Sequence, residues 1–179
     1  MFTPINSIQG YISGGGGNSA PTHVTGKYGA FYDTTIQAAT LTNTAYAMQY
    51  NSLDFANGVQ INNNALAQPT RIQVLADGYY NFQFSAQLVK TTGGGGVSTV
   101  DIWLRKNNNT DLPWTNSSVT MRNNGDKIIA SWNFLVQLLT FDYIEIMFAA
   151  DTTGITIDSA AAASPHPETP SVILTVWQI

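Results

Sequence analysis

The residues of this chain that could do chemistry are few and scattered. It has two histidines, His23 and His166, and no cysteine, so thiol nucleophiles and disulfides are excluded. Neither histidine sits at a predicted strand end beside a plausible serine or carboxylate partner, which general acid-base catalysis would need. We therefore expect no catalytic residue, no enzyme activity, no metal and no cofactor.

The acidic residues suit turns better than a reaction centre. Most of six aspartates lie in or near predicted turns, where Asp caps backbone amides; they are Asp101, Asp111, Asp126, Asp142, Asp151 and Asp158. A calcium site among them stays an alternative, although no Asp-x-Asp-x-Asp spacing supports it. A glycosidase would need two facing carboxylates about 5 to 9.5 Å apart, and no such pair can be nominated.

Two runs of four glycines, Gly14–Gly17 and Gly93–Gly96, are not phosphate loops. Neither run is followed by Lys-Ser/Thr or by a predicted helix, as a phosphate-binding loop would be. Glycine adopts backbone angles that other residues avoid, so both runs are interpreted as flexible joints.

The composition favours a subunit of an assembly. Charged residues make up 10% of the chain, against roughly 25% in typical soluble domains. Neutral amides and hydroxyls lose less hydration than ions when another protein covers them. The net charge is −4 and the seven Lys and Arg residues are scattered, which disfavours nucleic-acid binding.

The chain shows no sign of a membrane partner. It contains no apolar run of about 18 residues, the length that a spanning segment requires. Residues 1–8 lack the basic start and continuous apolar block of a secretion signal. We therefore expect synthesis in a cytoplasm without export by that route.

The elements that position these residues are strands, organised around residues 78–89. Tyr80, Phe82, Phe84, Ala86 and Leu88 alternate with polar residues, which is the period of a half-buried strand. Asp-Gly before this segment and the second glycine run after it are breakers that end the strand.

Similar patterns predict about ten strands in all. The sequence predicts strands at 28–35, 45–50, 59–61, 71–74, 100–105, 118–121, 127–139, 143–149, 155–157 and 171–179. Residues 160–170 contain three prolines and predict a loop. The expected fold is all-β, an antiparallel two-sheet jelly-roll sandwich, which occupies residues 28–179.

Residues 1–27 are predicted to form a flexible N-terminal extended arm with the first glycine run as its hinge. Spaced apolar residues favour docking of the arm on a neighbouring subunit, here the residues Phe2, Ile5, Ile8, Tyr11 and Ile12. A disordered leader is the alternative interpretation.

Four segments resemble the trimeric jelly rolls of the complement-head and tumour-necrosis-factor superfamily. Residues 76–82 (Ala-Asp-Gly-Tyr-Tyr-Asn-Phe) resemble the Pro-Gly-x-Tyr-x-Phe opening of that family's central strand, and residues 102–108 resemble its strand ending in Lys-Asn. Residues 127–148 resemble its Leu-rich hairpin and residues 171–177 its closing strand. The likeness covers residues 28–179; the second glycine run and the Ala/Pro-rich loop depart from it. It implies homotrimers without catalytic activity.

The composition of the chain is also similar to that of tailed-phage structural proteins with this fold. The wealth of Asn, Thr, Gly and Ala, the absence of Cys, and residues 79–88 carry this second resemblance. It implies a head-decoration (cement) protein at the virion surface, bound to the major capsid protein or another virion protein. The alternative is a tail-fibre or spike tip that binds a host receptor or glycan, where Trp103, Trp114 and tyrosines would stack on sugars.

Several strands carry apolar residues on both faces, although a sandwich buries only one face of each strand. A threefold neighbour would cover the second face. The trimer interface is therefore predicted at Tyr79, Tyr143, Met147, Ile173 and Trp177. The alternative is that the chain's own arm covers this surface.

Overall fold

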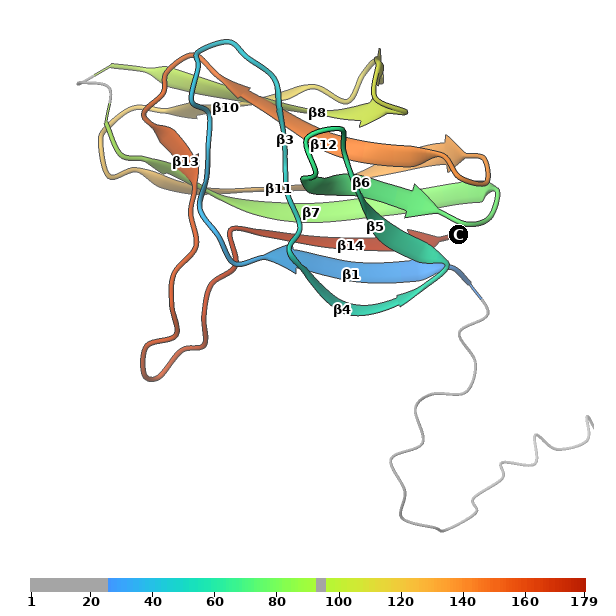
Figure 1. The fold of residues 1–179 in the computed structure, drawn as a ribbon. Coiled ribbons are helices and arrows are strands. Elements are labelled where there is room, and N and C mark those ends of the chain that lie inside the picture. The colour runs from blue at the N-terminus through green and yellow to red at the C-terminus, as the bar shows by residue number, and fades with distance from the viewer. Residues whose placement is uncertain (1–25, 93–95) are drawn as a thin grey trace, which may run out of the picture.

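The computed structural model describes residues 26–92 and 96–179. These residues contain no helix, and their strands form two antiparallel sheets of seven strands each, packed face to face as a sandwich (Figure 1). The predicted all-β sandwich is confirmed. The arm residues Phe2, Ile5, Ile8, Tyr11 and Ile12, the hinge and His23 lie outside the described residues.

The first sheet is built around the longest strand, β7. Its main path is β4 (Ser52–Asn57), β1 (Tyr28–Asp33), β14 (Val172–Gln178), β7 (Gly78–Lys90) and β11 (Lys127–Leu138). The short β13 (Ile155–Ile157) pairs with the end of β7 beyond β14, and β2 (Gln37–Ala38) pairs with β13.

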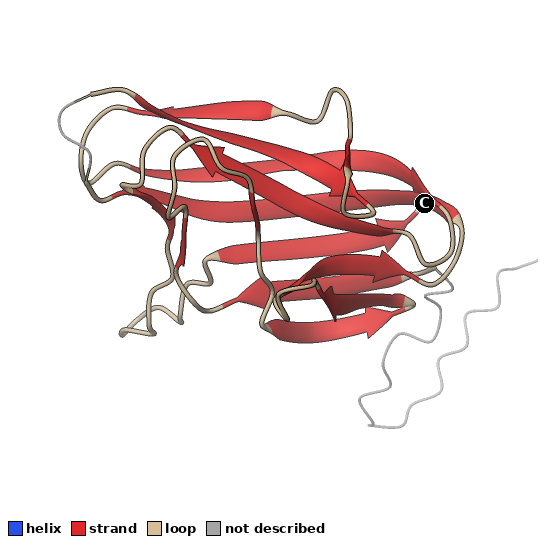
Figure 2. Cartoon of the chain, turned by 45° about the horizontal axis from the view of Figure 1, so that its top comes forward, coloured by secondary structure: helices blue, strands red, loops and turns tan. Residues whose placement is uncertain are grey.

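The second sheet covers the inner face of the first (Figure 2). Its order is β10 (Ser117–Met121), β8 (Ser98–Lys106), β12 (Tyr143–Ala150), β6 (Pro69–Val74) and β5 (Val59–Asn63). Two short strands complete it: β3 (Tyr46–Ala47) pairs with β12, and β9 (Thr110–Asp111) pairs with β8. Gly58 joins β4 to β5 and carries the chain between the sheets at φ 70°, a left-handed angle that glycine adopts readily.

The alternation in the central strand has the predicted consequence. Its five inward side chains are at most 1% exposed: Tyr80, Phe82, Phe84, Ala86 and Leu88. β11 pairs with β7 along its whole length, from Lys127 opposite Val89 to Leu138 opposite Gly78. Residues that face each other across this ladder share a face of the sheet, so both strands present one row inward and one row outward.

The core lies between the two sheets. The second sheet contributes fully buried side chains from β8 and β12, namely Val100, Ile102, Leu104, Ile144 and Ile146. At the edge of the first sheet, the Phe84 ring lies 5.0 Å from that of Trp132, edge to face, and 6.2 Å from that of Phe134, stacked. Such pairs add stabilisation of about 0.5–1.5 kcal/mol beyond the burial of their area.

Two predicted strand assignments need correction. β4 was not predicted, because Leu53 and Phe55 are both exposed on an edge strand that pairs only with β1 and shows no buried row. The predicted strand 45–50 shrinks to Tyr46–Ala47, although Met48 and Tyr50 are buried as its alternation requires. Residues 160–170 form an exposed loop that projects from the sandwich between β13 and β14, as predicted (Figure 1).

Candidate functional site

The residues examined first as possible catalysts do not converge. His166 lies in the exposed loop, where its Nδ1 is 3.0 Å from the carbonyl oxygen of Pro167. Across residues 26–92 and 96–179, no three His, Asp or Glu side chains gather in the way that a metal ion would need. The same residues include no helix with the length and apolar character needed to cross a membrane.

Two of the six aspartates cap turns as predicted. The Asp126 carboxylate accepts hydrogen bonds from the backbone N–H groups of Asn123 and Arg122, both at 2.8 Å, which lower its pKa. Asp142 accepts the backbone N–H of Leu139 at 2.9 Å. Partial burial raises the pKa of Asp142, but bonds from Lys106, Asn107 and Leu139 outweigh burial and leave this pKa below its ordinary value. Asp101 and Asp111 instead lie on strands β8 and β9.

The outer face of the first sheet carries large apolar side chains that this chain leaves exposed. Five residues on β7, β11 and β14 form what we call the apolar face: Tyr79 (54% exposed), Ile129 (62%), Leu135 (61%), Ile173 (42%) and Trp177 (39%). Leu135 and Trp177 flank Asn81 in one row of the sheet, because both pair with it. Neighbouring strands are about 4.8 Å apart, so these three side chains lie side by side, and the polar row of Gln83, Asn133 and Thr175 separates them from Ile173 and Ile129.

The polar side chains between the apolar residues of this face are neutral, and several are bonded to one another or to the sheet backbone. Asn133 Nδ2 donates to Asn81 Oδ1 at 2.9 Å, and Ser131 Oγ donates to the Phe84 carbonyl at 2.9 Å. A hollow of about 200 Å³ lies between Ser131 and Ile173. The sequence has no charged residue in 79–89, 128–138 or 172–178, and the charges on β7, β11 and β14 are confined to strand ends, at Lys90 and Lys127. The stretches that form this face therefore carry no ion to desolvate.

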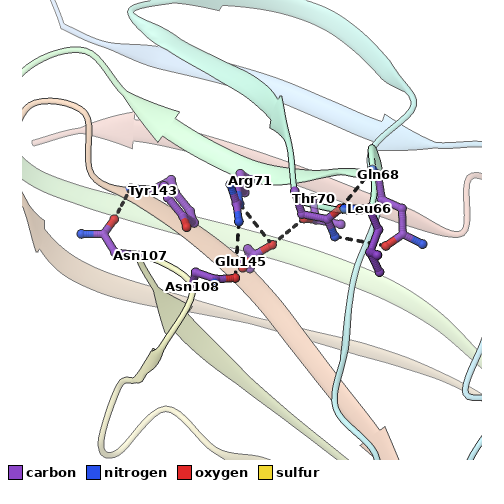
Figure 3. Close-up of polar contacts among 9 residues, drawn as sticks. Leu66, Gln68, Thr70, Arg71, Asn107, Asn108, Tyr143 and Glu145 are labelled. Carbon is purple, nitrogen blue, oxygen red and sulfur yellow. Dashed lines mark hydrogen bonds and ion pairs between the residues drawn. The ribbon is translucent and has the colours of Figure 1, made fainter.

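The outer face of the second sheet is organised by charge. Glu145 is 4% exposed, accepts a hydrogen bond from Thr70 Oγ1 at 2.5 Å and lies 3.8 Å from Arg71 Nε (Figure 3). The Arg71 guanidinium sits 4.6 Å from the centre of the Tyr143 ring and donates to Asn108 Oδ1 at 3.3 Å. The network satisfies the buried carboxylate and joins β6 to β12.

Beside this network, an open hollow of about 500 Å³ lies near β8, β9 and the loop before β10. Its lining includes Trp103, Trp114, Asp101 and Asp111. Asp111 accepts hydrogen bonds from Arg105 Nε and Trp103 Nε1, both at 2.7 Å. The bond from Arg105, with help from that of Trp103, lowers the pKa of Asp111.

The five residues predicted for the trimer interface do not lie on one surface. Tyr79, Ile173 and Trp177 share the apolar face. Tyr143 and Met147 lie on β12 of the other sheet. Tyr143 is half-buried against Arg71, and Met147 is only 4% exposed between its register neighbours Ala47 and Trp103. The prediction grouped them because outward apolar positions on different sheets look alike in a sequence.

Sequence reasoning missed three notable groups. Ile129 and Leu135 occupy outward positions of the strand at 127–139. The available signal was that they are apolar at positions where the alternation predicts polar residues. Glu145 stands in an outward position where an acidic residue is ordinary, so nothing marked it as buried. Lys90 is fully buried and donates to the carbonyls of Gly96 and Arg122, which makes it a structural cation at the end of β7.

Comparison with known proteins adds no family. No protein-family model matches the chain, and no curated protein matches its sequence.

Proposed function

We propose that this chain is a non-enzymatic structural protein that forms a homotrimer through its apolar face and decorates the head of a tailed phage as a cement protein. The single observation that carries the proposal is the outer surface of β7, β11 and β14. It exposes five large apolar side chains, and the stretches that carry them, residues 79–89, 128–138 and 172–178, include no charged residue. Interface cores are likewise depleted in charge and enriched in Trp, Tyr and other large apolar groups.

The occupant that fits this surface is a further copy of the same chain. Neutral amide and hydroxyl groups already bonded within the sheet, such as Asn81 with Asn133, lose little when covered. Burial of Trp177, Leu135 and their neighbours would remove apolar area from water and drive association. The resemblance to trimeric jelly rolls supports a threefold arrangement.

The position of residue 26 supports a role for the arm. The backbone N–H of Gln178 donates to the Lys27 carbonyl at 2.8 Å, so the described chain begins beside the end of β14. Lys27 therefore lies beside the end of β14 that carries Trp177, at one edge of the apolar face. We propose that Phe2, Ile5, Ile8, Tyr11 and Ile12 hold the trimer to the major capsid protein or another virion protein.

Sedimentation of the purified chain tests self-association. At micromolar concentration we expect a species of three times the chain mass, and a monomer would overturn the proposal. Removal of residues 1–12 should leave folded trimers that no longer add to capsid particles lacking the protein. Normal decoration by the truncated chain would show that the arm has no cement role.

A tail-fibre or spike tip that binds a host receptor or glycan is the second candidate function. The observation that favours it is the hollow on the second sheet, where two tryptophans and two aspartates line one open surface. An intact-particle image with and without the protein separates the two placements, since one puts it on the head and the other on the tail.

A further inference from the structure

The most unusual side chain outside the apolar face is Trp114. It is 97% exposed, and its backbone has φ 68°, in the left-handed region that bulky residues avoid. A strained position that presents the largest apolar side chain to solvent has no benefit for folding. Such outliers cluster at functional sites, which makes Trp114 a candidate for one.

The loop that carries Trp114 is fastened on both sides. The backbone N–H of Leu112 donates to the Leu104 carbonyl at 2.9 Å, and Thr115 Oγ1 both accepts from the Leu104 N–H at 3.1 Å and donates to the Leu112 carbonyl at 2.8 Å. Only Pro113 and Trp114 stand between these anchors. The backbone that carries the indole is therefore held by a fixed loop, so little backbone freedom is lost when a ligand stacks on the ring.

The second tryptophan of the hollow is also fixed. Trp103 Nε1 donates to Asp111 Oδ1 at 2.7 Å, and Asp111 is clamped by Arg105 through both carboxylate oxygens, at 2.7 and 3.2 Å. The hydrogen-bonding edge of the indole is thus occupied within the protein. What Trp103 offers to the hollow is the apolar, electron-rich surface of its ring.

Polar acceptors stand beside these rings. Oδ1 of Asp101 accepts hydrogen bonds from Ser118 Oγ and, at 3.4 Å, from Asn116 Nδ2. No described residue donates to Oδ2 of the same carboxylate. The Asn116 and Asn43 amides also line the hollow, and its floor includes the small side chain of Ala149, which pairs with Asp101.

From this arrangement we infer that the hollow binds a neutral saccharide, with sugar rings stacked on Trp114 and Trp103 and hydroxyl groups hydrogen-bonded to Asp101 and Asn116. Aromatic faces match the C–H faces of a pyranose, and a carboxylate accepts from adjacent hydroxyls. This site deepens the second candidate function and does not depend on self-association, because it lies on the sheet opposite the apolar face.

The charge of the hollow selects among saccharides. Asp111 is neutralised by Arg105, whereas the described residues place no cation within ion-pair distance of Asp101. A sialylated, uronic or sulfated sugar would meet this carboxylate without a compensating cation, so neutral sugars are favoured. Hydrolysis is not part of the inference. A general acid needs a protonated carboxyl, whereas the ion pair with Arg105 favours the ionised form of Asp111.

The test is a glycan array carrying neutral hexose and N-acetylhexosamine oligosaccharides beside their sialylated and sulfated counterparts, probed with the full chain. We expect binding to a subset of the neutral glycans, and titration of the strongest should quench tryptophan fluorescence. An array with no neutral binder, or with binding only to acidic glycans, would overturn the inference.

Variants then locate the site. Trp114→Ala and Ala149→Leu should each lower the affinity for the strongest-binding neutral glycan at least tenfold. The first removes an aromatic ring, and the second places a larger side chain in the hollow. Trp114→Gly should lose binding equally while its Tm stays the same or rises, because glycine relieves the left-handed strain. Asp101→Asn should weaken binding several-fold and leave the Tm unchanged.

Trp177→Ala is the matched control. It removes an exposed tryptophan from the other sheet, so it should weaken self-association and leave glycan affinity unchanged. Glycan binding that survives Trp114→Ala but is lost in Trp177→Ala would place the sugar on the apolar face and refute the site described here. An unaltered chain that is monomeric but still binds the glycan would instead count against the assembly proposal alone.

Discussion

The two outer faces of the sandwich differ in the side chains that they expose to solvent. On the first sheet, β7, β11 and β14 expose apolar side chains separated by neutral amides and hydroxyls. On the second sheet and its adjoining turns lie the three ion pairs of the described residues, Arg71–Glu145, Arg105–Asp111 and Lys106–Asp142. The outer face of the second sheet has its charged side chains paired within the chain. The outer face of the first sheet has apolar side chains that nothing in the described chain covers.

This difference separates a face suited to large-area burial from one suited to small ligands. Covering a face that holds ions requires their desolvation, which costs several kcal/mol per ion unless the partner replaces their contacts. Covering the apolar face has no such cost. The charged face stays wetted and offers oriented carboxylates and rings to a ligand that brings its own hydroxyls.

The largest expected effect comes from placing a charge on the apolar face. Leu135→Lys or Trp177→Lys should weaken self-association at least a hundredfold, about 2.7 kcal/mol or more, because the ammonium would be buried without a partner. Sedimentation at several concentrations measures the dissociation constant. Both positions are exposed within the chain, so the free energy of unfolding of the monomer should change little.

A charge on the other outer face is the control for that experiment. Gln60→Lys on β5 lies at an exposed position of the second sheet. It should leave the association constant unchanged. Equal losses from Gln60→Lys and Leu135→Lys would erase the proposed distinction between the faces.

The buried carboxylate of the second sheet should matter for folding and not for assembly. Glu145→Ala removes the acceptor of the Thr70 hydroxyl and the partner of Arg71, and we expect a loss of about 2–3 kcal/mol in the free energy of unfolding. Urea denaturation at pH 7 measures the change. The matched control, Asp54→Ala at an exposed edge position, should stay within about 0.5 kcal/mol of the parent.

A smaller effect isolates one bond of the same network. Thr70 is 1% exposed, so Thr70→Val keeps its shape and removes only the hydroxyl that donates to Glu145. We expect a loss of about 1.5–2 kcal/mol, the lower part of the range for a hydrogen bond to a charged group. In the Glu145→Ala background the same substitution should cost less, and a double-mutant cycle measures this coupling. Strict additivity would show that the two side chains act separately.

The smallest effect is the pH dependence. The pKa values of Asp111 and Asp126 are lowered, by the Arg105 side chain and by the Asn123 and Arg122 backbone N–H groups respectively. A lowered folded-state pKa contributes stability above the unfolded value of about 3.9, and this stability is lost as the pH falls through the folded pKa. Stability should therefore be flat from pH 7 to about 5 and decline below about 4.

Association should be insensitive to pH over the range in which the fold is stable. The strands of the apolar face have no carboxyl to titrate, so the association constant should not change between pH 7 and 5. Asp126→Asn should flatten the acid limb of the stability curve without affecting association. A trimer that dissociates between pH 7 and 5 would mean that titrating groups lie at the interface.

Much of the fold could be predicted because it depends on neighbours in sequence. The alternation from Tyr80 to Leu88 determines which side chains of β7 are buried, and the prolines at 165, 167 and 170 exclude a regular element in the loop. The edge strand β4 was missed, because an exposed strand needs no alternating pattern and is held by its hydrogen bonds to β1.

The candidate surfaces were predicted only in part. Trp103 and Trp114 were identified as exposed aromatic residues, but their shared hollow with Asp101 and Asp111 depends on the pairing of β8 with β9, β10 and β12. Tyr143 and Met147 lie on the other sheet from Trp177 for the same reason: alternation shows that a side chain points outward and does not show from which sheet.

The order of the residues by itself determined an all-β chain, the inward row of each long strand and a low content of charged residues, because these properties follow from side-chain type and a period of two. Only the tertiary structure decided that the uncharged apolar residues gather on one sheet while the paired charges and the tryptophan hollow gather on the other. That division depends on which strands pair, and strand pairing is set by contacts between residues as far apart in the chain as Asn81 and Trp177.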